Sequence, residues 1–147
     1  MIYVPQKKDY IINMKRIGVI GENTYENKLK IKEVIHQLKT KYGTDIEIVS
    51  RGTIQGAEKY IKKYTLDLGL QYTEFNPPHT NHNLYSALNE GFYNKPYKPF
   101  NFILRDKLFV NYVDVCICLV EEQSSAKNLK TCIDLLEKNK KKYIIMN

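Results

Sequence analysis

Glycines and hydroxyl residues gather in three short polar turns, each between an apolar run and a segment with helical spacing. The turns span residues 21–25, 50–56 and 121–128. A helix that begins at such a turn offers free backbone N–H groups and a partial positive charge. Glycine has no Cβ, so its backbone can approach a phosphate closely. The three turns therefore predict a site for a phosphorylated or nucleotide-like ligand.

Both the side chains and the backbone of these turns could hold such a ligand. The residues that the turns contribute are Gly21, Asn23, Thr24, Tyr25, Ser50, Arg51, Gly52, Thr53, Gly56, Ser124, Ser125, Lys127 and Asn128. The ring of Tyr25 could stack on a base, although an aromatic residue at the start of a helix also packs against the core. The same residue types cap helices, so capping alone is the alternative interpretation of each turn.

Other chemistries have less support in the sequence. The dinucleotide-binding pattern G-x-G-x-x-G and a P-loop ending in G-K-[ST] are both absent. His79 and His82 have an H-x-x-H spacing, but no cysteine or carboxylate cluster lies beside them, so we predict no metal site and no cofactor. Glu121 and Glu122 follow an apolar strand, where a catalytic carboxylate could stand, although paired glutamates at a strand end are more often solvated.

Alternating strands and helices must position these turns. Apolar runs predict strands at 16–20, 45–50, 71–75, 113–120 and 143–146, and helical spacing predicts helices at 25–42, 54–68, 102–110 and 126–138. Helices between consecutive strands require crossover connections. The predicted fold class is therefore α/β, a Rossmann-like three-layer α/β/α arrangement with a mostly parallel sheet of about five strands. The strand at 113–120 is the most apolar and is expected at the centre. Ligands of such sheets bind beyond the carboxyl ends of the strands.

Residues 76–99 interrupt the alternation of strands and helices. This segment holds four of the five prolines, together with His79, His82 and several asparagines. A connection of this length in a compact domain is usually functional or mobile. We expect a loop here, with a short helix at 84–90.

Composition sets wider limits on the protein. A chain of 147 residues fits one domain, which we place at 16–147, after an N-terminal arm or extra strand at 1–15. The net charge of +7 allows nucleic acid as a partner but does not favour it, because the lysines are scattered. No apolar stretch approaches the about 20 residues of a membrane span. With three cysteines that fit core thiols and no apolar signal core, the sequence predicts a cytoplasmic protein that does not bind a membrane.

The order and spacing of these motifs resemble the SLOG superfamily, named for the Smf/DprA and LOG proteins, and within it the small YspA-like, YpsA-related members. Four segments carry the resemblance: I-G-E-N-T-Y at 20–25, V-S-R-G-T-I-Q-G-A-E at 49–58, R-D-x-x-F at 105–109 followed by V-D at 113–114, and S-S-A-K-N at 124–128. The resemblance covers about residues 16–145, nearly the whole chain.

This resemblance implies a Rossmann-like sheet that binds nucleotides or nucleotide-derived ligands at its turns, usually in a homodimer or higher homo-oligomer. It also implies that Arg105 reaches the site from its helix. The chain departs from the family pattern at Arg51, where a glycine is usual, and at Gln55 and Glu58, where arginine and aspartate are usual. The fourth motif has no glycines, and the phosphoribohydrolase signature P-G-G-x-G-T-x-x-E is absent. Binding tolerates such changes more readily than hydrolysis does.

The function that the sequence favours is binding of a nucleotide or nucleotide-derived ligand, as a sensor or a sequestering protein. One alternative is an N-glycosidic hydrolase of nucleoside monophosphates that uses Glu121 or Glu122. Another is DprA-like binding of single-stranded DNA, driven by the charge of +7. Whether the protein is an enzyme stays open. For the favoured function, Arg51→Ala or Gly56→Val should abolish ligand binding and leave the fold intact.

Overall fold

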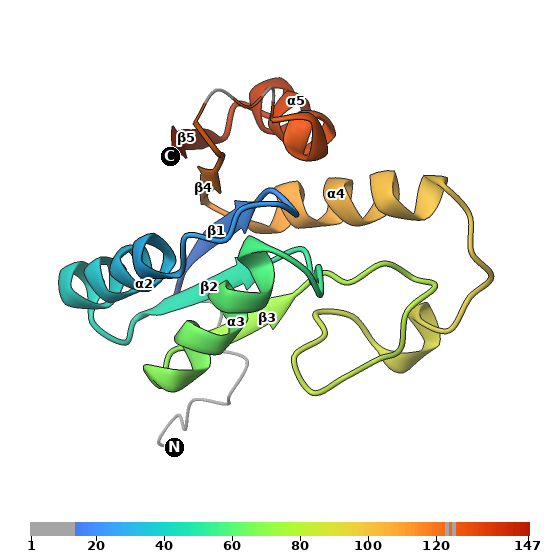
Figure 1. Cartoon of the computed structure of the whole chain (residues 1–147). Coiled ribbons are helices and arrows are strands. Elements are labelled where there is room, and N and C mark those ends of the chain that lie inside the picture. Colours follow the sequence, from blue (N-terminus) through green and yellow to red (C-terminus); the bar gives the residue numbers. More distant parts are fainter. Residues whose placement is uncertain (1–13, 123, 125) are drawn as a thin grey trace, which may run out of the picture.

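Strands and helices alternate along the chain in the computed structural model, which describes residues 14–122, 124 and 126–147 (Figure 1). The strands are β1 (Lys15–Gly21), β2 (Ile46–Ser50), β3 (Gln71–Glu74), β4 (Val115–Leu119) and β5 (Lys142–Met146). The α-helices are α2 (Lys28–Tyr42), α3 (Ala57–Asp67), α4 (Phe100–Tyr112) and α5 (Lys130–Lys138). Two short 3₁₀ helices, η1 (Glu90–Phe92) and η2 (Lys127–Leu129), complete the described elements.

The five strands form one sheet in the order β3-β2-β1-β4-β5, and every neighbouring pair is parallel. Helices α2 and α3 pack together on one face, and α4 and α5 pack on the other. The predicted Rossmann-like three-layer α/β/α fold with a parallel sheet is therefore confirmed. Residues 1–13, most of the predicted N-terminal arm, lie outside the described residues, and the domain boundary stays a prediction.

Alternating residues of the strands supply the two cores. Ile17 and Val19 of β1 pack toward α2 and α3, whereas Ile20 packs toward α4 and α5. Cys116 and Cys118 of β4 share one face, since both belong to the α4–α5 core and their sulfurs lie 4.0 Å apart. Alternation of this kind, with both faces buried, is what a parallel sheet covered by helices requires.

The predicted centre of the sheet is wrong. The most apolar strand is β4, but β1 is the middle strand and β4 lies between β1 and β5. Both faces of β4 are covered, and a strand covered on both faces is mostly apolar, whatever its place in the order. Hydrophobicity therefore identified β4 as an interior strand but did not give its position in the strand order.

The segment 76–99 contains no α-helix at 84–90. An isolated parallel bridge joins Ser86 to Glu74 of β3 instead: Glu74 N–H donates to the Tyr85 carbonyl at 2.9 Å, and Ala87 N–H donates to the Glu74 carbonyl at 2.9 Å. The short helical turn of this segment comes later, as η1.

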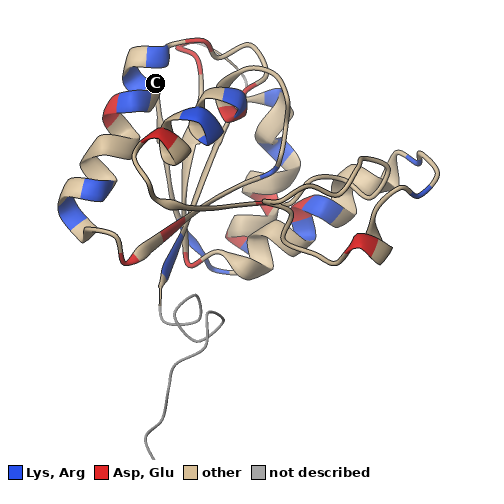
Figure 2. Ribbon diagram, turned by 90° about the horizontal axis from the view of Figure 1, so that it is seen from below, with Lys and Arg blue, Asp and Glu red and all other residues tan. Residues whose placement is uncertain are grey.

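Charged side chains are spread over the molecule. Figure 2 shows Lys and Arg residues distributed over the helices, with Asp and Glu residues among them. None of the described helices is long and apolar enough to span a membrane.

Candidate functional site

A cavity of about 390 Å³ lies beyond the carboxyl end of β2, and we call it the β2 pocket. Its walls come from the β1–α2 and β2–α3 turns, the start of the 76–99 segment, α4 and the start of α5. The lining residues are Asn23, Arg51, Gly52, Thr53, Ile54, Pro77, His79, Thr80, Phe102, Ile103, Arg105, Asp106, Asn128 and Thr131. This is the edge of the sheet at which parallel α/β folds bind ligands.

The β2 pocket collects only part of the predicted site. The predicted residues that line it are Asn23, Arg51, Gly52, Thr53, Arg105 and Asn128. Those that are described but do not line it are Gly21, Thr24, Tyr25, Ser50, Gly56, Ser124 and Lys127. Ser125 lies outside the described residues. The ligand-binding role of each residue stays a prediction.

Arg51 is a partner of acidic side chains and not a free donor. Its Nη2 lies 2.7 Å from Glu58 Oε2, its backbone N–H donates to Glu58 Oε1 at 2.6 Å, and its Nη1 lies 3.9 Å from Asp106 Oδ1. Burial alone would lower the pKa of Arg51, but the carboxylates of Glu58 and Asp106 more than offset burial and raise that pKa. Arg51 therefore stays charged, and its guanidinium stays paired with Glu58 and Asp106 inside the protein.

Arg105 completes a buried group of four charges, which we call the Arg51 cluster (Arg51, Glu58, Arg105 and Asp106). Arg105 Nε donates to Asp106 Oδ1 at 2.7 Å, and Nη1 donates to the Arg51 carbonyl at 2.8 Å. Burial raises the pKa of Asp106, while the two arginines act in the opposite direction. Among the described residues, Arg105 Nη2 has no hydrogen-bond partner. Since Arg105 lines the β2 pocket, the N–H groups of Nη2 are among the donors that it can offer to a ligand.

Apolar groups form the part of the β2 pocket beside Arg105. The ring of Phe102 lies with its centroid 5.6 Å from the guanidinium carbon of Arg105. His79 packs edge-to-face against Phe102 and Tyr97, with centroids 5.2 and 4.9 Å apart. Ile54 is 83% exposed, because α3 begins at Ala57 and not at 54 as predicted. An aromatic wall beside a guanidinium suits a flat ring that carries a polar or anionic group.

The turns after β1 and β4 bind each other. Glu22 is buried, and its carboxylate accepts hydrogen bonds from Glu121 N–H at 2.8 Å and from Ser124 Oγ at 2.6 Å. These are the kinds of donor that would hold a phosphate between the two strands. An internal carboxylate therefore already occupies them.

Two glycines of the predicted phosphate turns allow close packing of the chain on itself. A Cβ at Gly56 would lie 2.3 Å from the carbonyl oxygen of Asn23, and one at Gly21 would lie 2.3 Å from Ala57 Cβ. The close backbone approach that these glycines suggested is thus between the β1–α2 and β2–α3 turns.

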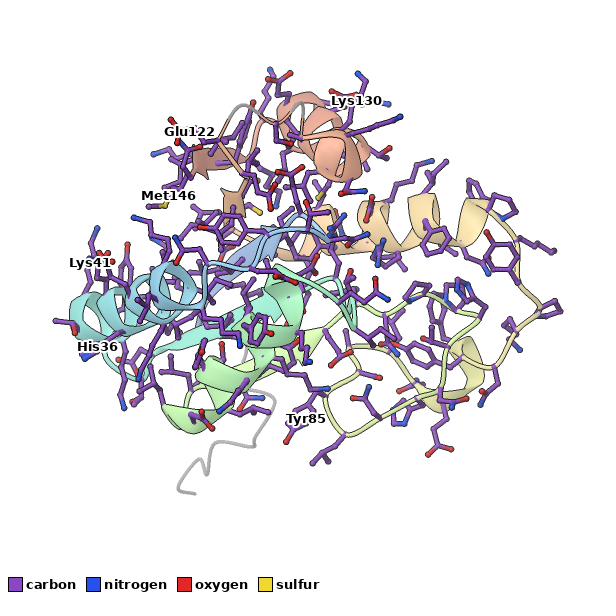
Figure 3. The ribbon with its side chains drawn as sticks, in the orientation of Figure 1. His36, Lys41, Tyr85, Glu122, Lys130 and Met146 are labelled. Atoms are coloured by element: carbon purple, nitrogen blue, oxygen red, sulfur yellow. The ribbon has the colours of Figure 1, made fainter. Side chains whose placement is uncertain are left out.

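Tyr25 and the two glutamates lie at a separate hollow of about 260 Å³, which is also lined by Glu26, Asn27 and Asn147. Tyr25 is buried in the α2–α3 core, as in the alternative interpretation of this residue. Within the described part of the chain its hydroxyl has no hydrogen-bond partner, and burial, followed by the charge of Glu121, raises its pKa. Figure 3 shows Glu122 near Met146 at the β4–β5 side of the sheet.

Sequence reasoning missed the lining that the 76–99 segment and the first turn of α4 give to the β2 pocket. Pro77, His79 and Thr80 come from the 76–99 segment, and Phe102 and Ile103 come from α4. The length of that segment indicated a functional role, but His79 was considered only as a metal ligand. Among the described residues no group of three or more His, Cys, Asp or Glu side chains could hold a metal ion.

Comparison with known proteins finds likeness in structure alone. No family model and no curated protein matches the chain. The fold is similar to the molybdenum cofactor binding protein from Rippkaea orientalis, with a TM-score of 0.64 and 19% identity over 90% of this chain and 76% of that one. It is similar to the molybdenum cofactor carrier protein from Chlamydomonas reinhardtii, with a TM-score of 0.61 and 14% identity over the same shares.

A third similar structure is DNA processing protein A from Helicobacter pylori, described for its single-stranded DNA binding mode. The TM-score is 0.69 and the identity 16%, over 98% of this chain and 70% of that one. All three have SLOG-type folds, in agreement with the resemblance in sequence. Identities this low show a shared fold and no more.

Proposed function

We propose that the protein binds a nucleotide or nucleotide-derived ligand in the β2 pocket, as a sensor or a sequestering protein. The observation that carries this proposal is the pairing of Arg105 Nη2, which has no partner among the described residues, with the ring of Phe102 on the same wall. The ring would stack on a heterocycle, and the guanidinium would bind a polar or anionic substituent.

The charge balance of the β2 pocket favours a ligand with few charges. The Arg51 cluster has two guanidiniums and two carboxylates, so its formal charges cancel. A volume of about 390 Å³ is also near the lower end of the roughly 300–1,000 Å³ of small-molecule sites. We therefore favour a nucleoside or a nucleoside monophosphate over a dinucleotide or a polyphosphate.

Binding has more support than hydrolysis. Asp106 is the carboxylate that lines the β2 pocket, and Arg105 Nε already binds it. Glu121 and Glu122, the residues considered for an N-glycosidic hydrolase, line the separate hollow beside Tyr25. The molybdenum cofactor binding described for two similar structures agrees with small-molecule binding at a fold of this kind.

The test is a shift in melting temperature with a panel of bases, nucleosides, nucleotides and the molybdenum cofactor. We expect a monophosphate or related compound to stabilise the protein, since a ligand at about 100 times its Kd adds about 2.7 kcal/mol. Phe102→Ala should abolish the shift. Phe100→Ala is the matched control, because Phe100 is an exposed aromatic residue of the same helix that does not line the β2 pocket. Equal shifts for both variants, or no shift with any compound, would overturn the proposal.

Binding of single-stranded DNA is a second candidate, favoured by exposed apolar side chains at the mouth of the β2 pocket. Ile54, Tyr97, Phe102 and Ile103 are all exposed there, and bases stack on such surfaces. This candidate predicts oligonucleotide binding that weakens steeply with salt and is reduced by Tyr97→Ala. Binding that ignores salt, or no binding at all, excludes it.

The oligomer and the compartment stay predictions. We infer a homodimer or higher homo-oligomer from the SLOG resemblance, and a cytoplasmic protein from the sequence. The outer edge strand β5 exposes Ile144 and Ile145, which offer an apolar surface for self-association. Sedimentation of Ile145→Lys beside the wild type tests whether that surface is used.

A further inference from the structure

The side chain of Asn101 fixes the protonation pattern of His79 in the β2 pocket. Asn101 Nδ2 lies 3.2 Å from the Pro96 carbonyl oxygen and 3.1 Å from His79 Nδ1. An amide nitrogen has two hydrogens and no acceptor capacity. Each hydrogen therefore has one acceptor, and His79 Nδ1 must be the acceptor of the second.

The orientation of the amide follows from the same contacts. The Pro96 carbonyl can only accept, so turning the amide over would place two oxygens against each other. Asn101 is buried, and the ring of His79 is held edge-to-face by Tyr97 and Phe102. Since Nδ1 accepts, the neutral imidazole carries its proton on Nε2.

We propose that His79 selects ligands through this Nε2–H, which donates to an acceptor atom on a heteroaromatic ring. The inference rests on the proposed function of the β2 pocket, which His79 lines beside Phe102. With Nδ1 engaged by Asn101, Nε2–H is the polar group of the side chain that His79 can present to a ligand. The ligand class is a heterocycle with an unprotonated ring nitrogen or a carbonyl oxygen on the edge that meets His79.

The first experiment reads the tautomer without any ligand. Nitrogen-15 correlation spectra of the ligand-free protein should show His79 with a protonated Nε2 and an unprotonated Nδ1. The chain has three histidines, so the His79→Gln spectrum assigns the signals. Asn101→Ala removes the donor to Nδ1 and should let the two tautomers mix. A protonated Nδ1 in the wild type would overturn the inference even if nucleotides bind.

The second experiment measures selectivity with purine and pyrimidine nucleoside monophosphates and analogues that each lack one acceptor atom. For the wild type, loss of the acceptor that meets His79 should weaken binding roughly tenfold, the range of one hydrogen bond. His79→Phe keeps an aromatic ring and should bind both compounds equally. His82→Gln is the control, because His82 does not line the β2 pocket.

The outcomes separate the two proposals. If the wild type binds a monophosphate and all its analogues equally tightly, the role of His79 is overturned and ligand binding stands. The same holds if His79→Phe distinguishes the monophosphate from its analogues as well as the wild type does. No binding of any monophosphate, despite a protonated Nε2, overturns the proposed function and this inference with it.

Discussion

Arg51 and Glu58 depend on each other inside the β2–α3 turn. Each departs from the SLOG pattern, which has a glycine and an aspartate at these positions, and the two side chains contact each other at 2.7 Å. Without Glu58, Arg51 would keep only its longer contact with Asp106 at 3.9 Å, and without Arg51, the buried Glu58 would lose the cation that lies 2.7 Å away. The two departures therefore compensate for each other, and Arg51 is a structural residue as well as part of the wall of the β2 pocket.

Arg51→Ala should destabilise the fold by about 3–5 kcal/mol, because it leaves a buried carboxylate without its partner. This replaces the expectation from the sequence that the variant keeps its fold and loses only ligand binding. Urea denaturation followed by circular dichroism measures the loss. The double variant Arg51→Met with Glu58→Leu should recover much of it, since both charges are then absent.

Lys63→Ala is the control for this comparison. Lys63 pairs with Asp67 on the surface of α3 at 2.8 Å, with both side chains more than half exposed. We expect little change in its denaturation midpoint, since exposed pairs contribute little. If Arg51→Ala and Lys63→Ala change the free energy of unfolding by the same small amount, the Arg51 cluster does not stabilise the fold.

The turns between strands and helices use their polar groups and glycines largely on one another. Glu22 joins the β1–α2 turn to the β4–α5 turn, and Gly56 lets the β2–α3 turn lie against Asn23. Such contacts fix the relative position of three elements around the β2 pocket. They also explain why residues of ligand-binding type recur at these turns without all of them reaching the cavity.

Gly56→Ala should cost clearly more stability than Gly43→Ala. The two glycines have almost the same backbone conformation, with φ and ψ of 67° and −145° for Gly56 and of 68° and −143° for Gly43. A side chain in this region costs about 1–3 kcal/mol at either position. Only at Gly56 would the new Cβ also meet backbone, whereas no atom lies within 4 Å of a Cβ at Gly43. Paired urea titrations measure the difference, and equal losses would exclude the packing role.

The sequence was sufficient for the strands but not for the complete site. Apolar runs and crossover lengths gave all five strands within about two residues, because both faces of a covered parallel sheet must be apolar. The start of α3 was predicted three residues too early, at Ile54. Spacing alone cannot distinguish an exposed apolar side chain such as Ile54 from a core residue. His79 and Phe102 come together only through the path of the 76–99 segment, which long-range hydrogen bonds such as Ala87 N–H to Glu74 determine.

Two tyrosines, the buried Tyr72 and the half-buried Tyr112, couple the stability of the complete fold to alkaline pH. Burial raises the pKa of Tyr72, and burial followed by the charge of Glu47 raises the pKa of Tyr112. Tyr112 Oη donates to both carboxylate oxygens of Glu47, at 2.8 and 2.9 Å. The neutral phenol is therefore the form that the folded state accommodates.

The free energy of unfolding should fall as the pH rises above 10.0, the ordinary pKa of tyrosine. In that range the unfolded chain releases phenolic protons that the folded protein retains, so the unfolded state gains relative stability. Urea titrations from about pH 8 to about pH 11, with tyrosinate absorbance as a second signal, measure the slope. Tyr112→Phe should make the decline less steep. A slope that is unchanged in this variant would contradict the assignment to Tyr112.

The central position of β1 also has a consequence for the order of folding during synthesis. β1 pairs with β2 along one edge and with β4 along the other. Strands β2 and β3 follow β1 closely in the chain, whereas β4 is made roughly 90 residues after β1 ends. At about 5–20 residues per second, translation leaves that second edge open for roughly 5–20 s. The nascent chain thus carries an unpaired apolar edge in the middle of its future sheet, where a ribosome-associated chaperone would protect it against pairing with another chain.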